Sequence, residues 1–431
     1  MMTTPRNVRG RFFVLVLAVL ALAAAGCGGE DDATTGDTGA ATATTDAATT
    51  AAETPETPTE PTAGAEETTT GPTTEAEDTG DGQAAPADCD GLLVGIAGPF
   101  TGDAASIGQE QLNWARFALE RFNADNGTNF ALVEADTQLD PAQATTVAQQ
   151  FVSNGDILAV VGPAGSQEAE AVGPIFEPDN LAYIGMSATR TSLTGGDYPT
   201  FFRVVPNDDA QGPTDATYMV DELGAQNVFI IDDQTSYSTG LADIVQPLLE
   251  EAGVTVTRDS VPQDQTDFSA LVSRISDDTD IVFLPWQLAA SAQLFSQQME
   301  EQGKTATIFG SDGLFSPDDF SAEGAYVSSF APDITALPEQ AELVEAYTEQ
   351  YGEFGTFGPP TYAATQVALT AVLAACEAGD VSREAVLEQV GDVTITDSIL
   401  GAPLTFDANG DVEGAQFYIF RIEGGEYVLV E

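Results

Sequence analysis

Two hydroxyl side chains follow apolar segments at positions suited to holding a small anion. Ser166 ends the segment VVGPAGS, in which we expect a buried strand to run into a helix, and Thr189 ends the segment GMSAT after the next apolar run. Ligands of open α/β sheets bind beyond the carboxyl ends of the strands, where helix N-termini present free N–H groups. A hydroxyl and a backbone N–H at each position would hold a carboxylate. The alternative for Ser166 is a helix N-cap, and the two roles are compatible.

Two other kinds of chemistry are poorly supported. The turn VGIAGPFTG at residues 94–102 follows another apolar run, but its glycines do not have the GxGxxG spacing, and the sequence has no GxxxxGK[ST]. Nucleotide binding is therefore not expected. The sequence also has no GxSxG segment and no histidine, so Ser166 lacks a general base and we expect no enzymatic activity.

Apolar segments alternate with helical patterns throughout residues 91–431. Strands are expected at 92–97, 130–133, 157–161, 181–184, 227–231, 254–256, 281–284 and 307–309, and helices at 107–126 and 361–376. This alternation is typical of parallel sheets with helices on both faces. About 340 residues is large for one hydrophobic core, so the pattern predicts two α/β lobes.

The charge balance excludes several classes of function. The chain of 431 residues has 69 Asp and Glu, 12 Lys and Arg, and a formal net charge of −57. Such a surface repels phosphate backbones, which excludes nucleic-acid binding through a basic face. The absence of histidine and the presence of only three cysteines exclude histidine-ligated metals, haem and cysteine-only metal cages. We therefore expect no metal and no cofactor.

The acidic residues extend into the predicted lobes. Outside residues 1–88 the chain holds 54 acids and nine basic residues. One interpretation is adaptation to high salt, where screening removes the self-repulsion of the surface. The other is simple acidic solubility.

The N-terminus has the pattern of an export signal. Arg6, Arg9 and Arg11 precede an apolar run at 12–25, which is shorter than the roughly 20 residues that span a bilayer. The segment AAGC that ends at Cys27 resembles a bacterial lipobox, so residues 1–27 are expected to be a lipoprotein signal peptide with Cys27 lipidated. Two acyl chains would then anchor the protein outside the cell. The alternative is an ordinary cleaved signal.

Residues 28–88 have the composition of a disordered tether. They contain 15 acids, many Thr and Ala, no aromatic residue and no Lys or Arg. Such a segment buries too little apolar surface to offset the entropy of ordering. A flexible coil of this length reaches roughly 40–45 Å. A glycosylated stalk is compatible with the same composition.

Nine motifs follow one another after residue 91. They are GPFTGDAASIGQEQLNWARFALERFNADNG, VVGPAGSQ, SATRTSLT, FRVVPNDDAQGP, DDQTSYSTGLA, TDFSALVSRI, GSDGLF, PTYAATQVAL and FDANGDVEG. Their content and order resemble the leucine/isoleucine/valine-binding proteins of ABC transporters. The resemblance implies a type I periplasmic binding protein fold, with two doubly wound α/β lobes joined by three crossovers and a ligand held in the cleft by hinge closure. The lobes would comprise residues 89–208 with 331–407, and 209–330 with 408–431.

The resemblance also implies roles for individual residues. Ser166, beside Gly165, would bind the α-carboxylate of an amino acid through its hydroxyl and N–H, and Thr189 would add a second hydroxyl and N–H. The carbonyl of Ser187 and the carboxylate of Asp312 would accept from the α-ammonium. Tyr237 would close over the ligand from the second lobe. The alternatives are a turn residue for Asp312 and a surface aromatic for Tyr237.

The sequence departs from the family along the predicted side-chain wall. Ile107 stands where the family commonly has an aromatic residue, and Trp286 and Gln287 occupy a strip that is richer in tyrosine in the family. Asp312 is shorter than the usual glutamate, and Phe357 is a further candidate for the wall. Because of these departures, the resemblance does not identify the side chain of the ligand.

The remaining two cysteines are expected to pair. The resemblance places Cys89 and Cys376 in the same lobe, and an exported protein meets an oxidising environment. The alternative is two free thiols. The segment DANGD at 407–411 superficially resembles a calcium loop, but its glycine falls too early, so a tight turn is expected.

Together these features predict a lipid-anchored, extracytoplasmic substrate-binding protein of an ABC importer. It would be a monomer that captures an amino acid, with a branched-chain one favoured, and delivers it to a permease and its ATPase. The alternatives are a binding protein for an amide, urea or an aromatic acid, and a ligand sensor of the same fold.

Overall fold

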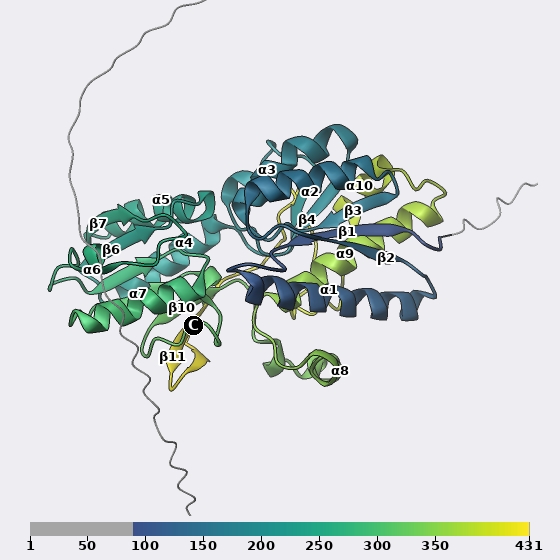
Figure 1. Ribbon diagram of the computed structural model, residues 1–431. Helices are drawn as coiled ribbons and strands as arrows, with labels where there is room; N and C mark the ends of the chain where they lie inside the picture. Colours follow the sequence, from purple (N-terminus) through teal and green to yellow (C-terminus); the bar gives the residue numbers. More distant parts are fainter. Residues whose placement is uncertain (1–88, 431) are drawn as a thin grey trace, which may run out of the picture. The chain divides into compact units, whose positions relative to one another are not determined.

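The computed structural model describes residues 89–430 (Figure 1). The predicted signal peptide, Cys27 and the predicted tether lie outside the described residues. No helix in the described part is both long and apolar enough to cross a membrane.

The first sheet has five parallel strands in the order β2-β1-β3-β4-β5. Their bounds are Leu93–Gly98 (β1), Ala131–Asp136 (β2), Ile157–Val161 (β3), Ala182–Gly185 (β4) and Phe201–Arg203 (β5). The helices of this lobe are Ala105–Asn126 (α1), Pro141–Ser153 (α2), Ser166–Phe176 (α3), Ala341–Tyr351 (α8), Gly358–Glu377 (α9) and Arg383–Asp392 (α10).

Helices cover both faces of this sheet (Figure 1). Side chains alternate along β3 from Ala159 onward, so Ala159 and Val161 pack with α1 and α9, whereas Val160 packs with α2 and α3. The central strands β1, β3 and β4 are buried on both faces, which explains why they are continuous apolar runs in the sequence.

The second sheet has seven strands in the order β12-β11-β10-β9-β8-β6-β7. Strands β6 to β10 pair in parallel, whereas β11 and β12 are antiparallel. The strand bounds are Asn227–Asp232 (β6), Thr255–Ser260 (β7), Ile281–Leu284 (β8), Thr307–Gly310 (β9), Tyr326–Ser329 (β10), Tyr418–Glu423 (β11) and Glu426–Leu429 (β12). The helices are Asp208–Thr217 (α4), Ser236–Glu251 (α5), Ser269–Val272 (α6) and Ala289–Glu301 (α7).

The eight predicted strands and both predicted helices are confirmed, with small shifts of their ends. The strands that the sequence did not reveal are β5, which has three residues, and β10, β11 and β12. Strand β11 alternates buried with exposed positions from Phe420 to Glu423, and β12 has no fully buried residue, so both lack the continuous apolar run of a buried parallel strand.

Two residues just after the predicted boundary at residue 408 contact the first sheet. The N–H of Arg203 in β5 donates to the carbonyl of Gly410 (3.0 Å), and its guanidinium pairs with Asp411 at 2.5 Å. Asp411 thus forms an isolated bridge with Arg203 at the end of β5. The expected tight turn is present, because Asp407 Oδ1 accepts from the N–H groups of Asn409 and Asp411.

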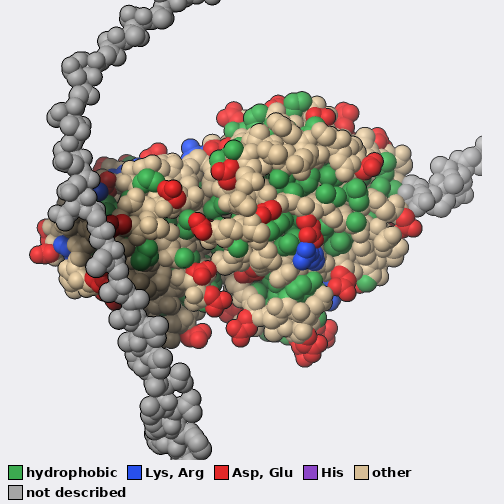
Figure 2. Space-filling view, in the orientation of Figure 1, with side chains coloured by type: hydrophobic (Ala, Val, Ile, Leu, Met, Phe, Trp, Pro, Cys, Tyr) green, Lys and Arg blue, Asp and Glu red, His purple; other side chains and the backbone are tan. Residues whose placement is uncertain are grey.

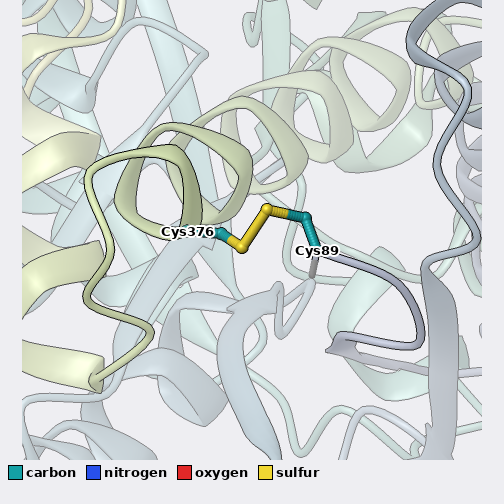
Figure 3. The surroundings of a disulfide bond; sticks show 2 residues. All are labelled: Cys89 and Cys376. Atoms are coloured by element: carbon teal, nitrogen blue, oxygen red, sulfur yellow. A yellow bond between two sulfur atoms is a disulfide. The ribbon is translucent and has the colours of Figure 1, made fainter. Parts of the chain in front are cut away.

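A disulfide joins Cys89 to Cys376 (Figure 3). Cys376 lies in the last turn of α9, and Cys89 lies just before β1. Their Cα atoms are 5.9 Å apart. The bond therefore fixes the beginning of the described chain to the end of a buried helix.

The surface is strongly acidic, with Asp and Glu spread over the visible face and few Lys or Arg (Figure 2). Because salt screens this repulsion, we expect the melting temperature to rise between dilute buffer and 2 M NaCl by several degrees, or roughly 1–2 kcal/mol of unfolding free energy. Sucrose, which stabilises proteins without screening charge, is the control. A melting temperature that does not change with NaCl would contradict adaptation to high salt and leave simple solubility as the interpretation of the acidic surface.

Candidate ligand-binding site

Ser166 is the first residue of α3 but is not the cap of that helix. The capping position is Gly165, whose N–H donates to Glu168 Oε2 at 2.8 Å. The N–H of Gly165, which we predicted as a ligand-binding residue together with Ser166, is thus already paired within the helix start, and the N-cap alternative for Ser166 is wrong. Ser166 Oγ accepts from the N–H of Arg190 (3.2 Å) and keeps its own proton for a second partner.

The loop after β4 is tied to this helix start. Ser187 Oγ donates to the carbonyl of Ala164 and accepts from Gln111 Nε2, both at 2.9 Å. Thr189 is fully buried, and its hydroxyl faces the carboxyl of Asp208. The structure thus brings Ser166, Ser187 and Thr189 together at the ends of β3 and β4, as predicted.

Asp312 opens a short turn, Asp312–Leu314, directly after β9. The next residue must be glycine, because a Cβ on Gly313 would lie 2.4 Å from the carbonyl oxygen of Trp286. Asp312 Oδ1 accepts from the Tyr237 hydroxyl at 2.6 Å and from Gln211 Nε2 at 2.7 Å. No other side chain among the described residues donates to Oδ2. Tyr237 is 2% exposed, so the surface interpretation of this tyrosine is wrong.

Helix α4 adds two carboxyl groups that the sequence analysis missed. Asp208, Gln211 and Asp215 are spaced by three and four residues, which places them on one face of the helix, and all three are buried. Burial raises the pKa of Asp208 to about 7, that of Asp312 to about 6, and that of Asp215 well above its ordinary value. The helical spacing in DDAQGPTD was the available signal.

Trp286 does not line this site. Its indole N–H donates to the carbonyl of Ile231 (2.7 Å), and its ring packs on Phe268 and Phe295 in the core of the second lobe. The predicted wall position is therefore wrong for Trp286. Gln287 accepts from Gln167 of α3 at 2.8 Å, so this neighbour does connect the two lobes.

Ile107 and Phe357 line a cavity of about 280 Å³. The rest of its wall comes from the first lobe, including Tyr351 and Phe354, and from the loop Phe315–Asp318 of the second. None of the hydroxyl and carboxyl groups above line it. The structure therefore separates the predicted residues into a buried polar cluster and a partly apolar cavity.

The buried carboxyls predict an unusual dependence of stability on pH. Burial raises the pKa values of Glu110, Glu168 and Asp208 to about 7, whereas the unfolded chain has ordinary values near 4. The folded protein then binds more protons between about pH 4 and pH 7, so its unfolding free energy falls as the pH rises through this range, by a few kcal/mol in order of magnitude.

Melting curves at pH 5, 6, 7 and 8 measure this effect. Because Asp208→Asn removes one of the groups that must ionise, this variant should lose less stability over the same range. A wild-type melting temperature that rises with pH would contradict the prediction.

A comparison of the sequence with protein families gives a match to the periplasmic binding proteins over residues 92–426. The chain belongs to this family. It is a substrate-binding protein with the type I periplasmic binding fold, and membership implies an extracytoplasmic location.

Relatives agree with this assignment. The Leu/Ile/Val-binding protein homolog 2 of Brucella abortus is 29% identical over 343 residues, covering 78% of this chain and 91% of the relative. The leucine binding protein LivK of Thermotoga maritima superposes with a TM-score of 0.73 at 24% identity, covering 79% of this chain and 98% of the other. LivJ of Streptococcus pneumoniae, solved in complex with isoleucine, superposes with a TM-score of 0.71 at 22% identity. The match covers 79% of this chain and 99% of the other.

Proposed function

We propose that this substrate-binding protein captures an amino acid outside the cytoplasm and delivers it to the permease of an ABC importer. The observation that carries the proposal is the polar cluster. Hydroxyl donors at Ser166 and Thr189 follow β3 and β4, and a buried carboxylate, Asp312, follows β9 of the other lobe.

This arrangement complements a zwitterion. The ligand's carboxylate would receive the Ser166 and Thr189 hydroxyls with N–H groups at the start of α3, where the helix dipole favours an anion. Its ammonium would face Asp312, which is partly ionised at neutral pH because its pKa is raised only to about 6. Pairing at both ends avoids an uncompensated buried charge.

Two observations support a branched-chain amino acid. The relatives above are named for leucine, isoleucine and valine. The cavity lined by Ile107 and Phe357 has apolar walls that suit such a side chain. An amide, urea or an aromatic acid is the alternative, but such ligands would leave Asp312 buried without a cation.

The protein would act as a lipid-anchored monomer without catalytic activity. Ser166 Oγ accepts from a backbone N–H rather than donating to a base, and the sequence contains no histidine. Anchoring rests on lipidation at Cys27, and the permease and its ATPase are the proposed partners. A membrane sensor of the same fold is the second candidate partner.

A thermal-shift panel on the purified protein tests the proposal. A ligand at 100 times its Kd adds about 2.7 kcal/mol to the stability of the folded state. We expect shifts with L-leucine, L-isoleucine or L-valine and none with D-leucine, which cannot place both head groups and its side chain correctly. Shifts only with amides, urea or aromatic acids would overturn the zwitterion site. No shift with any of these compounds would contradict the proposed ligand class.

A further inference from the structure

Arg190 connects three parts of the candidate site. It directly follows Thr189, and its N–H donates to Ser166 Oγ at 3.2 Å. Its side chain then leaves the first lobe: Nε pairs with Glu170 of α3 at 2.7 Å, and Nη1 donates to the carbonyl of Ser236 at the start of α5 in the second lobe. One residue thus touches the carboxylate-binding hydroxyl and the opposite lobe.

The second lobe is shaped to receive this guanidinium. Gly240, one turn into α5, has no side chain where Arg190 lies, and a Cβ there would stand 2.6 Å from Nη1. Ser236 is followed by Tyr237, whose hydroxyl binds Asp312. The helix that Arg190 contacts is therefore the helix that carries the proposed closing tyrosine.

We propose that Arg190 is a positioning residue that couples ligand capture at Ser166 to the seating of α5, and with it Tyr237, against the first lobe. This inference rests on the proposed function, because it names how that same site closes. Arg190 itself does not contact the ligand. It acts through its N–H on Ser166 and through its guanidinium on the first turn of α5.

The chemistry of the contact favours arginine over lysine. The Nε–H donates to Ser192 Oγ at 3.0 Å, whose hydroxyl donates to Glu170, and Nη1 donates to the Ser236 carbonyl, so two partners are bound in fixed directions from one planar group. The ion pair is about one quarter exposed on each side, and such pairs contribute little to stability by themselves. Direction rather than charge is what this residue supplies, so Arg190→Lys should behave like Arg190→Ala.

Gly240→Ala separates this role from general destabilisation. Alanine favours an α-helix over glycine, so the fold should not weaken, yet the new methyl group would displace the guanidinium. With L-leucine as the probe, we expect Arg190→Ala and Gly240→Ala each to raise Kd at least tenfold through faster dissociation, with the association rate unchanged. Gly391→Ala in α10 is the matched control, because its nearest neighbouring atom is 3.7 Å from the new Cβ.

The double variant tests whether both changes act through one contact. Arg190→Ala with Gly240→Ala should bind like Arg190→Ala alone, since the methyl group then has nothing to displace. Small-angle X-ray scattering without ligand gives an independent readout: both single variants should have a larger radius of gyration than the wild type and Gly391→Ala. The inference would be overturned if Gly240→Ala had the Kd and the radius of gyration of the wild type. It would also be overturned if the affinity losses of the two single variants multiplied in the double variant. Failure of the wild type to bind leucine would instead contradict the proposed branched-chain ligand, and the scattering result would still decide the Arg190 contact.

Discussion

Replacing Asp312 by alanine is expected to raise the Kd for an amino acid at least a hundredfold. The ammonium group of the ligand would lose Asp312, its only proposed carboxylate partner. Because the carboxylate of the ligand would still be bound at Ser166 and Thr189, the ammonium would be left desolvated and without a counter-ion. Breaking a buried pair in this way costs about 3–5 kcal/mol, and each 1.4 kcal/mol is a factor of ten in Kd. Titration calorimetry of the variant against the ligand found in the thermal-shift panel measures the loss.

Two further variants separate charge from packing. Asp312→Asn keeps an oxygen that can accept from Tyr237 and Gln211 but removes the negative charge, so its loss of affinity should approach that of the alanine variant. Asp125→Ala, at an exposed position of α1, should bind normally. Wild-type affinity in Asp312→Asn would show that the carboxylate does not pair with an ammonium.

Removing the disulfide should have the largest effect on stability. Cys89 and Cys376 are 287 residues apart in sequence, so the bond closes nearly the whole described chain into one loop. The loop-entropy relation gives a stabilisation of about 5.7 kcal/mol for a loop of this length. The double variant Cys89→Ser, Cys376→Ser should therefore unfold at a markedly lower denaturant concentration than the oxidised wild type.

Reduction provides the matched comparison. The wild type in reducing agent should unfold like the double variant, whereas Cys27→Ser should leave the unfolding midpoint unchanged. Two free thiols in the oxidised wild type, detected by mass spectrometry after alkylation, would show that the bond does not form.

The sequence predicted the architecture well because the parallel strands are buried on both faces. Strands such as β3 and β8 are continuous apolar runs, and such runs need no partner to be recognised. Strand β5 has only three residues, and β11 joins the sheet by antiparallel pairing with β10, far earlier in the chain. These strands depend on tertiary pairing, which a single sequence does not display.

The site was predicted unevenly for a similar reason. Ser166, Thr189 and Asp312 follow strand ends, and the topology brings such ends together. Trp286 follows a strand as well, but its large ring packs in the core of its own lobe. The direction of a side chain after a strand depends on the space around it. Likewise, the capping role of Glu168 depends on a contact with the N–H of Gly165, three residues earlier.

The disulfide has a mechanical consequence for a protein held at one end. The predicted tether joins the described chain at residue 88, next to Cys89. A pulling force applied there is shared between the backbone that leads into β1 and, through the covalent bond to Cys376, the end of α9. Helix α9 is buried along its length, so the load is spread over the core of the first lobe. Part of a pull on the anchor would then bypass β1.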